Sequence, residues 1–159
     1  MRIQSIQNEY ENGIIDLILN IQQKEFNVPV TLEDQPDLLD IHNFYFKPGG
    51  TFLGAFIDGK LVGTIALLRF NPEAAAIRKM FVKKEFRGKE FGIAQQLLNQ
   101  LIELSKENGI KNLYLGTVTI LQAALRFYEK NNFVTIEKEA LPTDFPLMRP
   151  DNVFCHLKL

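Results

Sequence analysis

The sequence predicts a mixed α/β fold, in which an antiparallel β-meander passes into a β-α-β-α-β pattern with helices on both faces of one central sheet. Two β-rich runs, residues 51–57 and 61–70, are joined by Asp58-Gly59-Lys60, and an Asp-Gly pair between such runs is a strong hairpin signal. After this hairpin, strand patterns alternate with helical ones. The further expected strands are residues 77–82, 113–116, 133–137 and 153–159.

Apolar residues at three- and four-residue spacing predict the helices. This spacing extends along residues 91–105, and the glycine of Asn108-Gly109 then supplies a helix stop signal. A second helix is expected at residues 120–130. Two further patterns predict helices at residues 13–26 and 37–45.

Length and composition indicate one globular domain over residues 1–159, since domains cluster near roughly 100–150 residues. The apolar fraction of 46% and the charged fraction of 23% are typical of globular proteins rather than disordered ones. No apolar run approaches the roughly 20 residues of a membrane span, and the N-terminus lacks a signal-peptide pattern. A cytoplasmic protein with no membrane association is therefore expected.

Cys155 is the only cysteine, which excludes an internal disulfide and a thiolate zinc cage. We expect it to be a buried strand thiol. No motif indicates a metal site. The net charge of −1 argues against a nucleic-acid partner, because such domains carry a strongly basic surface.

One local cluster of basic residues departs from this balance. Six cations and two carboxylates lie within residues 78–90, which either form a solvated face or a binding site. They are Arg78, Lys79, Lys83, Lys84, Arg87 and Lys89, with Glu85 and Glu90.

The cluster belongs to a predicted strand, loop and helix at residues 77–98. A loop that enters a helix N-terminus presents unpaired N–H groups and about half a positive charge, so it predicts a phosphate or pyrophosphate site. Gly88 and Gly92 permit positive φ and a close approach of backbone to ligand. Neither the P-loop motif nor the G-x-G-x-x-G dinucleotide motif is present, which weakens a nucleotide-binding function without selecting the ligand.

Three segments carry a family resemblance. Residues 89–94 are Lys-Glu-Phe-Gly-Ile-Ala and are followed by Leu97-Leu98. Residues 124–133 are Ala-Leu-Arg-Phe-Tyr-Glu-Lys-Asn-Asn-Phe, and residues 61–66 are Leu-Val-Gly-Thr-Ile-Ala. In this order the segments resemble the signature of the GCN5-related N-acetyltransferase (GNAT) superfamily, which has a Q/R-x-x-G-x-G/A turn before a helix with paired leucines.

The match departs from the family pattern at several places, and the interval from Val82 to the helix is two residues longer than the common form. Lys89 stands where arginine or glutamine is usual, which keeps the charge but loses the planar fork. An alternative register begins the motif at Arg87 and places Glu90 at a glycine position; we prefer Lys89, because it preserves the helix phase and a small residue at Ala94. Asn132 replaces a common glycine, and asparagine tolerates left-handed backbone.

The resemblance implies an N-acetyltransferase that moves an acetyl group from acetyl-CoA to a primary amine by direct attack in a ternary complex. It places pantetheine along the strand that ends at Val82, with backbone groups of Phe81 and Val82 as partners, and backbone N–H groups near residues 80–82 suit an oxyanion. It implies a pyrophosphate site in the loop and helix start. The residues of this expected site are Arg87, Gly88, Lys89, Glu90, Phe91, Gly92, Ile93 and Ala94.

Tyr128 matches the family tyrosine that lies near the cofactor sulfur, so it is the expected catalytic acid. Reference pKa values of about 10 for tyrosine and about 8.5 for a thiol make full proton transfer uphill by roughly 2 kcal/mol. Tyr128 therefore either donates the proton or only hydrogen-bonds the thiolate while water supplies it.

The general base stays open. Family members often carry a glutamate before the loop, where this chain has alanines at residues 74–76. A water chain is an alternative to a side-chain base. The side-chain candidates are Glu33, Asp34, Asp37, Asp40, His42, Glu73 and His156.

Residues 28–46 and 141–152 are expected to form the walls of the acceptor site. The acidic residues of the first wall suit a cationic amine, or equally form a solvated face. The expected partner is a small-molecule or peptide amine, and the protein is a monomer or homodimer. Two other functions stay open: a non-catalytic acyl-CoA-binding or sensing module on the same fold, and a nucleotide-binding regulator.

Overall fold

The computed structural model describes all 159 residues and contains one seven-stranded sheet in the order β1-β2-β3-β4-β5-β7-β6. Only β4 and β5 pair in parallel; every other neighbouring pair is antiparallel. The strands are β1 Arg2–Ser5, β2 Thr51–Ile57, β3 Lys60–Asn71, β4 Ala74–Val82, β5 Asn112–Thr117, β6 Val134–Ile136 and β7 Val153–Lys158. This confirms the predicted mixed sheet.

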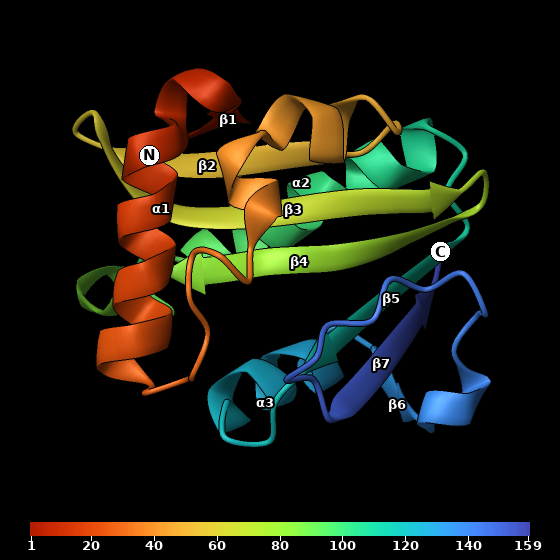
Figure 1. The fold of residues 1–159 in the computed structure, drawn as a ribbon. Helices are drawn as coiled ribbons and strands as arrows, with labels where there is room; N and C mark the ends of the chain where they lie inside the picture. Colours follow the sequence, from red (N-terminus) through yellow and green to blue (C-terminus); the bar gives the residue numbers. More distant parts are fainter.

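Three α-helices flank the sheet: α1 Glu11–Leu19, α2 Ile93–Glu107 and α3 Gln122–Lys130. Figure 1 shows α1 in front of the strands and α2 behind them, so helices cover both faces as predicted. One core cluster packs α2 and Tyr128 of α3 on one face, and a second packs α1 and Tyr45 on the other. The β-α-β-α-β pattern runs through β4, α2, β5, α3 and β6, with β7 inserted between β5 and β6.

Local backbone geometry explains several boundaries. Asp58 and Gly59 have φ of 50° and 76°, the positive values that a two-residue hairpin turn between β2 and β3 requires. Gly109, with φ of 76°, follows α2 as the stop signal predicted. Asn132 adopts φ of 72°, so it takes the left-handed conformation expected of a residue in a glycine position.

The structure differs from the predicted elements at four places. β4 begins at Ala74 rather than residue 77, because parallel pairing with β5 outweighs the low β-propensity of alanine. Residues 37–45 do not form one helix but two short turns, η3 (Pro36–Leu39) and η4 (His42–Phe46), separated at Asp40. The helix expected at residues 13–26 is α1 followed by a π-helical segment, η2 (Asn20–Glu25). The first strand, β1, was not predicted.

A β-bulge in β4 reverses which side chains face α2. Ala75 and Ile77 belong to the core cluster under α2, but beyond the bulge it is Met80 and Val82 that pack there. Lys79 is the extra residue, with φ of 54°, and its carbonyl accepts a 2.7 Å hydrogen bond from the buried Thr64 hydroxyl. A bulge of this kind bends a strand and redirects its side chains.

None of the helices is long and apolar enough to cross a membrane. Cys155 is 2% exposed on β7, as predicted, and burial raises the pKa of its thiol.

Candidate active site

β4 and β5 separate after three paired residues. Ala74–Ala76 pair with Asn112–Tyr114, whereas the rest of both strands is unpaired on the facing edge. A cavity of about 150 Å³ lies in this opening, and we call it the β4/β5 cavity. Its lining comes from η2 and the loop after it (Gln22, Phe26, Val28, Val30), β4 (Ala76, Ile77, Arg78, Lys79, Met80, Phe81), β5 and α3 (Leu115, Gly116, Thr117, Val118, Leu121, Ala124, Tyr128), and the C-terminal loop (Phe145, Pro146, Met148, Pro150, Asp151).

The predicted catalytic residue Tyr128 lies in this cavity. Its side chain is 5% exposed, and its ring packs against Phe127 and Phe133. Burial, with a smaller effect of Cys155, raises the pKa of Tyr128 well above its usual 10. The hydroxyl therefore stays protonated at neutral pH and suits a hydrogen-bond donor better than a full proton donor.

The start of α2 leaves backbone N–H groups free. Gly92 is the N-cap residue, with φ of 61°, and no side chain caps this end. The first backbone hydrogen bond of the helix runs from Gln96 N to Gly92 O at 3.0 Å. The N–H groups of Ile93, Ala94 and Gln95 consequently have no backbone acceptor, which is the arrangement that binds anions at helix N-termini.

Arg87 is partly exposed and already bound to other groups of the protein. Its Nε donates to the Val82 carbonyl at 2.8 Å, its guanidinium makes a two-point ion pair with Glu25, and it lies 5.5 Å from the centre of the Phe26 ring. Lys89 is exposed and forms no ion pair with another side chain. The other exposed loop residues of the predicted site are Gly88, Glu90 and Phe91.

Lys79 is buried and already has partners. Its Nζ donates to Gln35 and lies 3.6 Å from Asp37 Oδ2, while Asp37 also accepts a 2.5 Å hydrogen bond from the Tyr45 hydroxyl. Burial lowers the pKa of Lys79, and burial followed by the charge of Asp37 raises that of Tyr45. This network joins β4 to η3 and η4 behind the cavity.

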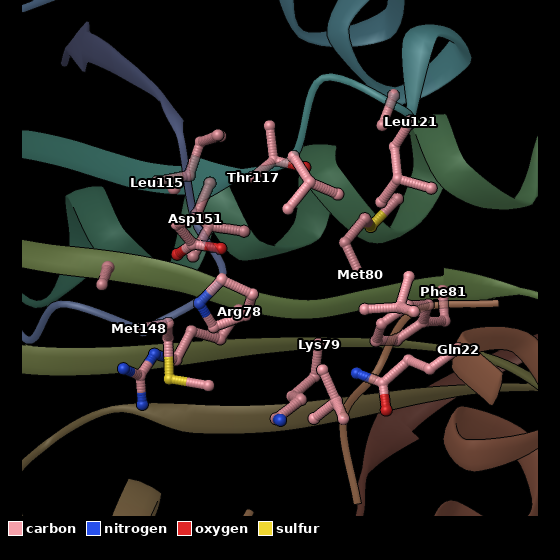
Figure 2. A pocket seen from close by; sticks show the side chains of 18 of the residues that line it. Gln22, Arg78, Lys79, Met80, Phe81, Leu115, Thr117, Leu121, Met148 and Asp151 are labelled. Atoms are coloured by element: carbon pink, nitrogen blue, oxygen red, sulfur yellow. The ribbon is translucent and has the colours of Figure 1, made fainter. Parts of the chain in front are cut away.

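Asp151 is a cavity residue that the sequence analysis missed. In Figure 2 it lies over β5 beside Leu115 and Thr117, while Arg78 and Lys79 extend from β4. Its carboxylate forms no ion pair. Burial raises its pKa to about 6, although Arg78 and Lys79 act in the opposite direction. Asp151 falls within the predicted acceptor wall, but nothing in its sequence neighbourhood marks it.

The side chains considered as bases from the sequence lie elsewhere. None of them lines the β4/β5 cavity. His42 bonds Gln7 at 2.8 Å and His156 bonds Asn112 at 2.8 Å, while Asp37 is held by Lys79. The exposed or partly exposed carboxylates are Glu33, Asp34, Asp40 and Glu73. No three histidine, cysteine or carboxylate side chains come together as a metal-ligand group.

The raised pKa of Asp151 predicts a stability cost at neutral pH. The folded protein binds the Asp151 proton more tightly than the unfolded chain does. The contribution of Asp151 to the free energy of unfolding is therefore fully present below about pH 4 and is lost as pH rises through about 6. The full shift corresponds to an upper limit of about 3 kcal/mol, roughly half of it between about pH 5 and about pH 7.5. Between these two pH values, the free energy of unfolding of Asp151→Asn should therefore rise by about 1–2 kcal/mol relative to that of wild type. Urea unfolding measures this difference. A pH-independent difference would contradict the raised pKa.

An opening between two strands that is lined by a protonated tyrosine, together with a helix N-terminus with free N–H groups, suits an extended anionic ligand next to a hydrogen-bond donor. The model of the acetyltransferase (GNAT) family matches residues 15–133. The chain belongs to this family.

Solved structures agree with this assignment. An acetyltransferase of the GNAT family from Staphylococcus aureus Mu50 superposes with a TM-score of 0.95 at 37% identity, over 99% of this chain and 98% of that one. PaiA N-acetyltransferase from Thermoplasma acidophilum, solved with coenzyme A, has a TM-score of 0.73 at 20% identity, covering 99% and 98%, and shows the same fold.

Among curated proteins, N-acetylaspartate synthetase of Xenopus tropicalis is 37% identical over 100 residues. The match covers 61% of this chain and 36% of that protein, so the chain spans about a third of the relative's length.

Proposed function

We propose that the protein is an acetyl-CoA-dependent N-acetyltransferase that acetylates a primary amine by direct attack in a ternary complex. The observation that carries this proposal is that Tyr128 lines the opening between β4 and β5. The family assignment and the free N–H groups at the start of α2 support it.

The residues present fit the cosubstrate. Acetyl-CoA supplies an activated acetyl thioester. The N–H groups of Ile93, Ala94 and Gln95 provide donors and positive potential for a pyrophosphate. The unpaired edge of β4 beyond Ala76 offers N–H and C=O groups to the amide chain of pantetheine, and its N–H groups are donors for charge that develops on a carbonyl oxygen.

Tyr128 acts in this scheme on the leaving group. Its protonated hydroxyl donates a hydrogen bond to the departing thiolate. Because burial raises the pKa of Tyr128, full transfer of its proton is even more unfavourable than reference values indicate, and water completes the protonation.

Acetyl-CoA is expected to stabilise the fold. A ligand that binds only the native state adds about 2.7 kcal/mol at 100 times its dissociation constant, which raises the melting temperature by about 5–10 °C in a domain of this size. Differential scanning fluorimetry with CoA, acetyl-CoA, ATP and NAD measures this. A shift with ATP and none with CoA would refute the proposal and favour a nucleotide-binding regulator.

Catalysis is tested separately from binding, because a sensing module on the same fold would bind CoA without turnover. The assay follows free thiol release from acetyl-CoA across a panel of primary amines. Acidic amino acids belong in it, since the relative named above is a synthetase of N-acetylaspartate. Tight CoA binding with no thiol release would favour the sensing module.

A single domain, a cytoplasmic location and a monomeric or homodimeric state complete the proposal. The apolar core clusters that lie on both faces of one sheet support a single domain. Light scattering measures the oligomeric state, and cell fractionation measures the location.

A further inference from the structure

Two charged side chains of the β4/β5 cavity have no ionic partner. Arg78 donates a 2.9 Å hydrogen bond to the Pro146 carbonyl but forms no ion pair, and the Asp151 carboxylate forms no ion pair either. The third charged group, Lys79, is neutralised by Asp37. The cavity thus presents one free cation and one free anion.

The fold keeps these two charges apart. Arg78 projects from β4 and is fixed by Pro146, whereas Asp151 lies so close over β5 that a Cβ on Gly116 would be 2.4 Å from its Oδ2. The two strands diverge after Ala76, so the charges stay farther apart than the 4.0 Å of an ion pair. Partly buried charges without partners cost free energy unless a ligand compensates them.

We propose that the acceptor is a zwitterionic α-amino acid with an uncharged side chain, which binds with its carboxylate at Arg78 and its ammonium group at Asp151. This inference rests on the proposed function and names the acceptor class for the same site. A guanidinium fork matches a carboxylate geometrically, and the carboxylate of Asp151 provides the complementary anion.

The uncharged side chain follows from the rest of the lining. Fourteen of the 22 lining residues are hydrophobic, and Lys79 is occupied by Asp37 and Gln35. A second carboxylate on the acceptor would therefore find no free cation. A cavity of about 150 Å³ is comparable with one that admits benzene, which favours a small or medium side chain.

The acidic residues between positions 33 and 40, which suit either a cationic acceptor or a solvated face, lie outside the cavity. Glu33 and Asp34 are exposed, and Asp37 is held by Lys79 and Tyr45. None of these carboxylates faces the cavity, so only Asp151 attracts an amine there.

Asp151 is the general base in this arrangement. Its carboxylate takes one proton from the acceptor ammonium, and the neutral nitrogen then forms a bond to the thioester carbonyl carbon. The C–S bond breaks, the thiolate gains a proton, and the nitrogen loses its second proton. One ammonium and one acetyl thioester thus give one acetamide, one thiol and one released proton.

The carboxylate arm of the proposal is tested with matched acceptors. Alanine, valine and leucine are compared with ethylamine, isobutylamine and 3-methylbutylamine, each of which lacks only the carboxylate, and aspartate supplies a second carboxylate. In wild type, kcat/KM for the amino acids should exceed that for the matched amines and for aspartate by about 100-fold, in line with the cost of an unpaired buried partner.

Arg78→Gln should reduce the ratio of amino acid to amine towards 1, and Arg78→Lys should restore part of it because the charge remains. The same amino acid and amine are compared in the variant and in wild type, so the difference in their basicities cancels. Equal rates for amino acids and amines in wild type, or a ratio that Arg78→Gln does not change, would overturn the carboxylate site while the acetyltransferase proposal stands.

The base is tested with Asp151→Asn, which keeps the shape of the side chain. We expect kcat to fall by about 100-fold or more with KM within a few fold. Gly116→Ala, which displaces the carboxylate without removing it, should also lower kcat. Asp144→Asn, in an exposed carboxylate of the same loop, is the matched control and should behave as wild type.

The pH profile separates a base from a structural residue. Arg78 and Lys79 of β4 and Tyr128 of α3 are the other titratable groups that face the cavity with Asp151, and β5 contributes none. Because burial raises the pKa of Asp151 to about 6, wild-type kcat should fall as pH drops through this value. The Asp151→Asn variant should lack this fall. A fall retained by the variant would overturn the role of Asp151.

Binding provides a readout that does not depend on turnover. Calorimetric titration of leucine and 3-methylbutylamine into the complex with CoA should detect binding of leucine alone. Thiol release with no acceptor, or no response to CoA, would refute the proposed function as a whole. CoA binding without leucine binding would overturn the acceptor class only.

Discussion

Gly92→Glu is expected to weaken CoA binding by at least about 100-fold while the fold survives. Gly92 is the N-cap residue of α2, and its φ of 61° places any side chain in the left-handed region at a cost of about 1–2 kcal/mol. An added Cβ would make only ordinary contacts, the nearest at 3.6 Å from Gln96. The new carboxylate would stand beside the proposed pyrophosphate site.

The size of the effect follows from electrostatics. Two like charges about 4 Å apart repel by roughly 4 kcal/mol at an effective dielectric constant near 20, and about 1.4 kcal/mol is a tenfold change in affinity. Isothermal titration calorimetry measures the affinity, and circular dichroism checks the fold.

The chain offers a matched control for this variant. Gly109→Glu introduces the same residue at the opposite end of the same helix, at φ of 76° and with no atom within 4 Å of the added Cβ. It should show the same conformational strain with unchanged CoA affinity. Similar affinities for Gly92→Glu and wild type would show that the pyrophosphate lies elsewhere and that the register from Lys89 is wrong.

Tyr128→Phe is expected to lower the rate of thiol release by about 100-fold, the low end of what positioned proton donors contribute. The phenylalanine keeps the ring, so the packing against Phe127 and Phe133 stays intact. CoA affinity should stay within a few fold, because the proposed phosphate contacts lie on α2.

The control is Tyr114→Phe, at a tyrosine of β5 that stacks on His156 and does not line the cavity. Steady-state rates of both variants are compared over about pH 6–9. Because the Tyr128 hydroxyl stays protonated over this range, its loss should lower the rate at every pH. Equal rates for Tyr128→Phe and wild type across this range would remove Tyr128 from the leaving-group step.

The sequence by itself determined the elements that depend on local chemistry. The hairpin at Asp58-Gly59, the glycine stop after α2 and the left-handed Asn132 each follow from the conformational freedom of one or two residues. The loop before α2 was equally predictable, because a free helix N-terminus is a property of the helix itself. The order of strands and helices then limited the fold to a mixed sheet with helices on both faces.

The tertiary structure alone decided how β4 and β5 open and what faces the opening. The bulge at Lys79 depends on Thr64 of the neighbouring strand, which no periodicity within β4 encodes. Asp151 becomes a candidate base only because the C-terminal loop lays it over Gly116, 35 residues earlier in the chain by the difference of their numbers. Its raised pKa comes from burial, so contacts between distant segments create the chemistry of the site where residue type alone gives an ordinary carboxylate.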